Sequence, residues 1–293
     1  MNSIALNIAG LGITVESEQP FADGFIGDRI RPFLASVPPA GAHITLRWLD
    51  QEPCGMSLGE EVFAPGSVWR MYRPAHGGDG WTAVISYSDD GRLTSTAAVL
   101  EVDSGWSSAR LTEASQPAPW SSLLNLGAGE LLVRTRIILE SGLVFHASAI
   151  DDSGSGVLMV GHAGAGKSTQ ATIWSAQEGV VALSDDRVGV RLHDGTAVAY
   201  GTPWGGTAGI AKNHSVPLKA ILVLEQAPEN ALVRLSVEDA APLLLARCFL
   251  PFWSESLTET AMDVLIHLLE KTPVYQFRCV PNESVVPVVR AVL

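Results

Sequence analysis

Residues 161–169 are Gly161-His162-Ala163-Gly164-Ala165-Gly166-Lys167-Ser168-Thr169, which match the pattern G-x-x-x-x-G-K-[ST]. Glycines in this pattern let successive backbone N–H groups point inward and cradle phosphate oxygens. The ammonium group of Lys167 can reach the β- and γ-phosphates of a nucleotide, and the Ser168 hydroxyl can bind Mg²⁺. The stretch therefore predicts a phosphate-binding loop.

The flanking residues favour this interpretation. Gly156–Val160 is a short apolar run typical of a buried strand, and Ser168–Trp174 has the character of a helix start. Strand, loop and helix in this order are the context that the motif requires. The alternative is a glycine-rich turn that only connects two elements.

Composition bounds the class of protein. The chain has 293 residues, 47% of them hydrophobic and 17% charged, which is typical of a well-packed globular protein of one or two domains. Its formal charge of −12 argues against a nucleic-acid partner. Cys54, Cys248 and Cys279 are widely separated and suggest neither a disulfide framework nor a structural zinc site. We find no signal peptide and no apolar run of membrane-spanning length, so we expect a cytoplasmic protein without a membrane partner.

The N-terminal part, residues 1–120, alternates short apolar stretches with turn signals. Strands are expected at His43–Leu49, Thr82–Ser88 and Leu93–Val102, with a hairpin-type turn at Asp89–Arg92 between the last two. One helix is expected within Phe21–Leu34. No catalytic arrangement is recognisable here, so we predict a mostly-β module, for which binding of the substrate is one candidate role.

Residues 121–293 follow a different rhythm. The stretch Gln116–Pro119 is the expected boundary, because it cannot continue a regular element. After it we expect a helix over Ser121–Glu140, capped by Ser121-Ser122, and then the strand–loop–helix–strand order of a P-loop α/β or mixed α+β core. Later elements are expected to be a helix, a strand and a terminal helix, at Thr258–Glu270, Pro273–Cys279 and Val285–Leu293.

Two further stretches near the loop carry candidate chemistry. Asp185 and Asp186 follow the apolar run Val180–Leu183, where one carboxylate could serve Mg²⁺ while the other faces an acceptor hydroxyl. The alternative is a solvated turn. His146 interrupts an apolar strand that we expect to form a hairpin with Gly156–Val160, which could bring it near the γ-phosphate or the acidic pair. The alternative is an ordinary core histidine.

Weaker candidates lie further along the chain. The loop Tyr200–Gly209 could close over a substrate, with Lys212 adding positive charge, or could be an ordinary flexible loop. Arg247 is either a phosphate partner or a surface arginine. Trp253 is more often a core residue than a ligand contact.

The order of His146-Ala147-Ser148, the glycine-rich loop and Leu183–Val188 resembles the kinase domain of HPr kinase/phosphorylase, whose fold is shared with phosphoenolpyruvate carboxykinase. More narrowly, the chain resembles HPr-kinase-like proteins found beside peptide-modification genes, including kinases of lasso-peptide precursors. The stretches Gly201–Trp204 and Pro273–Ser284 also resemble that group. The resemblance covers roughly residues 121–293.

The resemblance implies a P-loop kinase core in which residues 161–169 bind ATP and Ser168 with Asp185 helps to hold Mg²⁺. It implies that Asp186 is the base that takes the proton of the acceptor, with His146 beside it and Lys167 on the phosphates. The acceptor would be a serine hydroxyl of a peptide or small protein. HPr kinase/phosphorylase carries a Mg²⁺-binding glutamate downstream, whereas Ala199–Trp204 contains no acid. This departure argues against HPr as the substrate and against reverse phosphorolysis.

Two other classes stay open at this point: a kinase of a small-molecule hydroxyl, and a nucleotide-binding regulatory module that transfers nothing. The sequence leaves the oligomeric state open, including a homo-oligomer.

Overall fold

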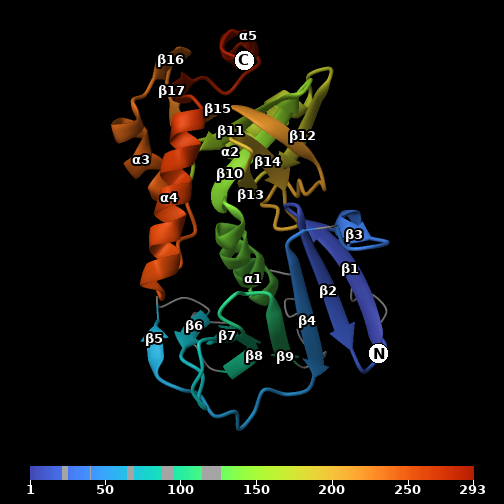
Figure 1. The fold of residues 1–293 in the computed structure, drawn as a ribbon. Coiled ribbons are helices and arrows are strands. Elements are labelled where there is room, and N and C mark those ends of the chain that lie inside the picture. The colour runs from blue at the N-terminus through green and yellow to red at the C-terminus, as the bar shows by residue number, and fades with distance from the viewer. Residues whose placement is uncertain (22–25, 40, 65–68, 88–94, 114–126) are drawn as a thin grey trace. The chain divides into compact units, whose positions relative to one another are not determined.

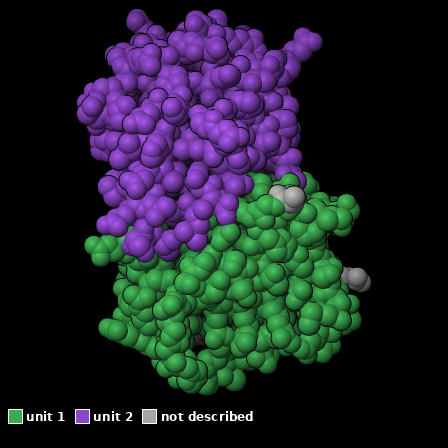
Figure 2. Space-filling view, in the orientation of Figure 1, with its two compact units in different colours: residues 1–136, 251–255 green, residues 137–250, 256–293 purple. Residues whose placement is uncertain are grey.

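The computed structural model describes residues 1–21, 26–39, 41–64, 69–87, 95–113 and 127–293. Its fold is mixed α+β, with two large sheets and few helices (Figure 1). The chain divides into two compact units, drawn in different colours in Figure 2: residues 1–136 with 251–255, and residues 137–250 with 256–293. The expected boundary at Gln116–Pro119 lies outside the described residues.

The first unit is built on a nine-stranded sheet with the order β3-β1-β2-β4-β9-β8-β7-β6-β5. Neighbouring strands are antiparallel except at β2–β4 and β4–β9, which are parallel. The strands are β1 Asn2–Ile8, β2 Leu11–Ser17, β3 Leu34–Ala35, β4 His43–Asp50, β5 Glu61–Phe63, β6 Trp69–Tyr72, β7 Trp81–Tyr87, β8 Ser95–Val102 and β9 Ser108–Glu113. The mostly-β character expected of this part is confirmed.

Individual predictions in this unit had different outcomes. The strands expected at His43–Leu49, Thr82–Ser88 and Leu93–Val102 correspond to β4, β7 and β8, and the last two pair antiparallel. Their connecting turn lies outside the described residues. The predicted helix over Phe21–Leu34 is wrong for the described part of that stretch, which holds only the 3₁₀ turn η1, Arg31–Phe33. A longer helix would place Pro32 in its interior, where the missing N–H and the ring disfavour it.

Aromatic side chains pack together in the first unit. Trp253, from the segment 251–255, lies 5.2 Å from the Trp69 ring, 6.1 Å from Phe63 and 6.1 Å from Trp106, measured between centroids. Trp253 and Trp106 are both buried. The expectation that Trp253 is a core residue is confirmed.

The second unit is built on an eight-stranded sheet in which two long strands are shared between two sets of neighbours. The first half of β10 pairs with β13, and its second half pairs with β11 and β12. Similarly, β15 pairs first with β14 and then with β11 and β17. The strands are β10 Gly142–Asp152, β11 Ser155–Val160, β12 Val180–Ser184, β13 Arg187–His193, β14 Thr196–Gly201, β15 Ser215–Gln226, β16 Ala231–Arg234 and β17 Val274–Cys279.

The described helices are α1 Ala128–Arg136, η2 Ile137–Glu140, α2 Lys167–Ser175, α3 Val237–Leu245, α4 Glu255–Lys271 and α5 Val285–Arg290. Of the helix expected over Ser121–Glu140, the described part is α1 and η2, and its expected caps lie outside the described residues. The helices expected over Thr258–Glu270 and Val285–Leu293 are confirmed as α4 and α5, and the strand expected over Pro273–Cys279 as β17. The sequence analysis missed α3. Of the helices in the described ranges, none has both the length and the apolar character for a membrane crossing.

One edge of this sheet collects the ends of several strands. Strands β11 and β12 both run antiparallel to β10, and β15 and β17 run parallel to β11. The carboxyl ends of β12, β11, β15 and β17 therefore meet at the same edge. Helix α2 packs against β10 and β12, and Trp174 of α2 joins Met159, Phe277 and Val289 in the core of this unit.

Candidate functional site

Each predicted site residue of the second unit lies at this carboxyl edge. The loop 161–166 follows β11, and Asp185 and Asp186 form the bend that follows β12. His146 precedes Ala147, which pairs with Val160 at the end of β11. Ligands of open α/β sheets bind outside the carboxyl ends of strands, so this edge is where chemistry is expected.

The backbone of residues 161–166 forms an open cradle. Gly164 has φ +82° and Gly166 has φ +102°, a conformation that other residues adopt at a cost. Apart from the glycine and its adjacent residues, no described atom lies within 4 Å of the point where a Cβ would stand on Gly164 or Gly166. Helix α2 starts directly after the loop, and within the described residues no side chain caps its first turn. A helix start with open space around its glycine loop fits a phosphate group, because the first N–H groups of a helix have no partner within the helix.

Lys167 is folded back onto this loop. Its Nζ donates to the carbonyl oxygens of Gly161 (3.0 Å) and His162 (3.3 Å), and the residue is 8% exposed. Burial lowers the pKa of Lys167, as do the positive charges of Arg247 and Arg187, while Asp186 opposes them. A desolvated ammonium with one donor to spare suits an anionic ligand that replaces the lost hydration.

Ser168 lies in the first turn of α2 and is half-buried. Within the described part of the chain its hydroxyl has no hydrogen-bond partner, which leaves it available to a ligand. Ser148 of β10 anchors this turn, because its hydroxyl donates to the carbonyl oxygen of Lys167 (3.2 Å). Thr169 is exposed, as are His162 and Ala163 in the loop.

Asp186 is held between a histidine and an arginine. Its Oδ1 lies 2.9 Å from His146 Nε2, and its Oδ2 accepts a hydrogen bond from Arg187 (2.6 Å). Burial alone raises the pKa of Asp186, but the hydrogen bond from His146 and the charges of Arg187 and Lys167 outweigh it and lower the pKa overall. Asp186 is therefore an ionised carboxylate near neutral pH, with His146 beside it as expected.

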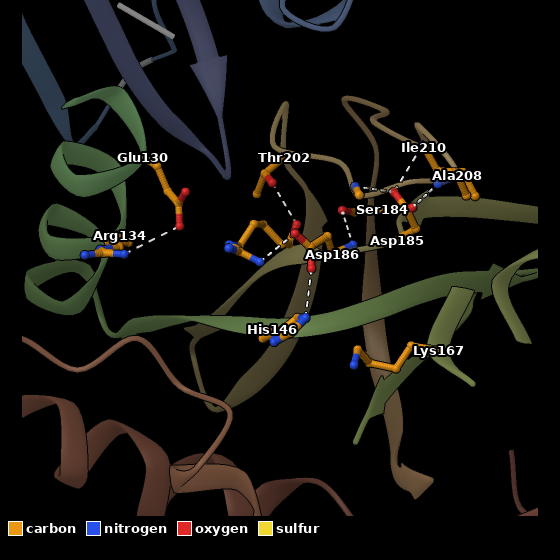
Figure 3. Close-up of polar contacts among 12 residues, drawn as sticks. Glu130, Arg134, His146, Lys167, Ser184, Asp185, Asp186, Thr202, Ala208 and Ile210 are labelled. Carbon is orange, nitrogen blue, oxygen red and sulfur yellow. Dashed lines mark hydrogen bonds and ion pairs between the residues drawn. The ribbon is translucent and has the colours of Figure 1, made fainter. Parts of the chain in front are cut away.

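Asp185 points the other way, into the loop that follows β14 (Figure 3). Its carboxylate accepts from the backbone N–H groups of Gly206 (2.8 Å), Ala208 (2.8 Å) and Ile210 (3.1 Å), and the residue is 2% exposed. A carboxylate offers about four lone-pair directions, so about one remains for a metal ion. The alternative of a solvated turn does not hold for Asp185, because the side chain is buried.

The loop after β14 is packed onto the acidic pair. A Cβ on Gly206 would stand 2.9 Å from Asp185 Oδ2 and 3.0 Å from the Cβ of Asp186, so only glycine fits there without displacement. Trp204 is 3% exposed and so belongs to the interior, whereas the sequence analysis considered it for closure over a substrate. The backbone N–H of Lys212 donates to Leu183 at the end of β12 (2.9 Å), while Lys212 itself is exposed.

Two residues of this site were underused in the sequence analysis. Arg187 was given no role, yet it pairs with Asp186 and its guanidinium lies 4.5 Å from the centroid of the Phe249 ring. Arg247, considered as a phosphate partner, is half-buried and close enough to lower the pKa of Lys167, and its carbonyl oxygen accepts from the His146 N–H (2.8 Å). Arg187 directly follows Asp186 in the sequence, so its pairing with that carboxylate had a local signal. Arg247 is brought to the site by the segment after α3, which no local pattern marks.

Among the residues that the structure describes, no group of three or more His, Cys, Asp or Glu side chains could hold a metal ion by itself. Ser168 and the remaining acceptor direction of Asp185 could therefore serve a metal ion only as part of a set completed by ligands from outside the chain. Such a set fits Mg²⁺, which keeps several waters and binds through one or two carboxylates together with substrate phosphates.

The chain matches a protein-family model. No curated protein matches the chain. The family described as SynChlorMet cassette protein ScmC matches residues 120–280, more than half of the 293 residues and including the whole carboxyl edge described above. The chain therefore belongs to the ScmC family.

Proposed function

We propose that this protein is an ATP- and Mg²⁺-dependent kinase that transfers the γ-phosphoryl group to a hydroxyl, that of a serine in a peptide or small protein. The observation that carries the proposal is the glycine cradle with Lys167 on it, at the same sheet edge as the ionised Asp186. The family description names a cassette and no activity, so the proposal rests on the site and on the resemblance to HPr-kinase-like proteins.

In this proposal the backbone of residues 161–166 and the first turn of α2 bind the phosphates, and Lys167 turns from its loop carbonyls to the β- and γ-phosphates. Ser168 and Asp185 help to hold Mg²⁺, with the phosphates as the main ligands. The metal ion neutralises charge that develops on the phosphoryl group when it is bound. Arg187 and Arg247 add positive charge near Lys167.

Asp186 receives the proton of the acceptor. The acceptor oxygen forms a bond to the γ-phosphorus while the bond from that phosphorus to the bridging oxygen breaks, and the hydroxyl proton passes to the Asp186 carboxylate. His146 orients this carboxylate through the 2.9 Å contact. A carboxylate with a low pKa is a weak base, which is adequate if little proton transfer has occurred when the phosphoryl group moves.

A peptide acceptor is supported by the resemblance and by charge. The chain carries a formal charge of −12, which favours a neutral or basic partner. The first unit has edge strands β3 and β5, and an extended peptide can add to such an edge through backbone hydrogen bonds.

The test uses single substitutions with separate readouts of binding and transfer. Lys167→Ala should abolish transfer, because the ammonium group offsets phosphate charge. Asp186→Asn keeps the shape, so nucleotide should still bind while transfer falls by about 10²–10⁴-fold. Lys219→Ala, at an exposed lysine of β15, is the matched control and should leave both unchanged.

Near-normal turnover of Lys167→Ala would refute the proposed site. Nucleotide binding by the wild type without transfer to any peptide, sugar or free serine would favour the regulatory module instead. Transfer to free metabolites alone would favour the small-molecule kinase.

A further inference from the structure

A pocket of about 400 Å³ lies beside the glycine loop. The strands pair in the order β12-β10-β11-β15-β17, so the pocket, at the ends of β15 and β17, lies on the other side of β11 from the acidic bend after β12. Its lining includes Gly166 and Gln170 from the loop and α2, Gln226 and Ala227 from the end of β15, and Cys279 and Pro281 from the end of β17. Three parallel strands thus supply its walls from their carboxyl ends. Its volume falls in the range of roughly 300–1,000 Å³ that is usual for small-molecule sites.

The lining of this pocket carries no charge. Its residues are apolar or small, apart from the hydroxyl of Thr169, the two amides of Gln170 and Gln226, and the thiol of Cys279. The charged groups Lys167, Asp186 and Arg187 belong to the other part of the edge, toward β10 and β12. The glycine loop therefore separates a neutral pocket from a charged cluster.

Hydrogen bonds fix the walls of the pocket to one another. Gln226 Nε2 donates to the carbonyl oxygen of Gly164 (2.6 Å), which ties β15 to the loop. The N–H of Ala227 donates to the Cys279 carbonyl oxygen (3.1 Å), which ties β15 to the end of β17. Gln170 Nε2 donates to the carbonyl oxygen of Val280 (3.4 Å), which ties α2 to the same segment. A pocket held on three sides needs little ordering when a ligand enters.

Gln170 lines the pocket with a buried amide. Gln170 is 2% exposed, and its Oε1 is buried without a partner among the described residues. Because this oxygen is closed to solvent, a ligand in the pocket would be held by burial of its apolar surface and not by this atom. A flat, largely apolar ring such as adenine suits the neutral lining.

We propose that this pocket receives the base and ribose of the nucleotide, with an adenine ring between the β15 and β17 ends and the triphosphate running over the glycine loop toward Lys167. This inference rests on the proposed function, because it requires phosphates on the loop. It assigns Gln226, Ala227 and the residues after β17 to nucleoside binding, a role that the sequence analysis gave to none of them.

The test separates the nucleoside from the phosphates. We would compare ATP with inorganic tripolyphosphate, both with Mg²⁺, by calorimetry on wild type, Ala227→Leu and the matched control Ala176→Leu. Ala176 is exposed at the end of α2 and does not line the pocket. Filling the pocket should weaken ATP binding by about 10- to 100-fold and leave tripolyphosphate binding unchanged. The control should change neither.

Each outcome bears on one claim. Wild-type protein that binds neither ligand would refute the proposed function itself. Wild-type protein that binds ATP no better than tripolyphosphate, or an Ala227→Leu variant that keeps full ATP affinity, would refute the nucleoside pocket and leave the phosphate site standing.

A second measurement covers the case in which Ala227→Leu fails to fold. Photolabelling of the wild type with 8-azidoadenosine triphosphate should modify the peptides that contain residues 226–228 or 279–281. Labelling confined to other peptides would overturn the assignment.

Discussion

Asp185→Asn tests whether the first acid of the pair holds the loop that packs on the second. Oδ1 of Asp185 accepts from Gly206 and Ile210, and Oδ2 accepts from Ala208. An asparagine keeps one acceptor oxygen and replaces the other by an NH₂ group that would face a backbone donor. The variant thus loses at least one hydrogen bond to a charged group and leaves a buried N–H unpaired.

The cost follows from these contacts. A hydrogen bond to a charged group contributes about 1.5–3 kcal/mol, and a buried donor without a partner costs about 1–3 kcal/mol, so we expect about 2.5–6 kcal/mol in total. The 2% exposure of Asp185 means that little of this is screened by solvent. Because the loss is local, it should appear as opening of residues 205–210 before it appears as global unfolding.

Hydrogen exchange measures this opening directly. The amides of Gly206, Ala208 and Ile210 should exchange about 70- to 25,000-fold faster in Asp185→Asn than in the wild type, at about 1.36 kcal/mol for each factor of ten. Asp194→Asn, at an exposed turn between β13 and β14, is the control and should leave these amides unchanged. Unchanged exchange in Asp185→Asn would refute the reasoning. A parallel Mg²⁺ titration of nucleotide affinity tests the metal role, since a variant with an unaltered Mg²⁺ requirement would remove Asp185 from the metal site.

Three further outcomes are expected. Burial and the charge of Asp50 raise the pKa of Glu113 from its ordinary 4.5 to about 8, so the folded state keeps a proton that the unfolded state releases. This group should therefore lower the free energy of unfolding by about 3–4 kcal/mol between pH 5 and 8. Urea unfolding at several pH values should show that Glu113→Gln loses this pH dependence. A variant with the wild-type pH dependence would contradict the raised pKa of Glu113. Trp253→Ala should lower the free energy of unfolding by about 3–5 kcal/mol and reduce hydrogen-exchange protection in β6 and β9 but not in β11. Reduced protection in β11 alone would contradict the assignment of Trp253 to the first unit. His146→Leu removes the hydrogen bond that holds the pKa of Asp186 down, so the pKa of Asp186 should rise. The fall in transfer rate on the acid side of the pH profile should then occur at higher pH. An unchanged pH profile would show that His146 does not act on Asp186.

Local patterns in the sequence were enough to predict much of the second unit. The strand–loop–helix around residues 161–169 depends on glycines, one lysine and an apolar run that are adjacent in the chain, and it is confirmed as β11, the loop and α2. The hairpin of β10 with β11 needed only a turn between two apolar runs, and it brings His146 to the end of β11. In the first unit, period-two alternation marked β4 and β7, and the expected turn at Asp89–Arg92 marked β8 as the strand after it.

Only the tertiary structure determines the contacts between strands that are distant in sequence. Asp185 and Asp186 are neighbours with equal chemistry, and their separate surroundings arise because the loop after β14 supplies three N–H groups to one and β10 supplies His146 to the other. The neutral pocket joins residues more than a hundred positions apart, from Gln170 to Cys279, through the parallel pairing of β11, β15 and β17. Parallel pairing depends on packing across the whole sheet and not on a turn between the paired strands. No local sequence pattern therefore predicts it.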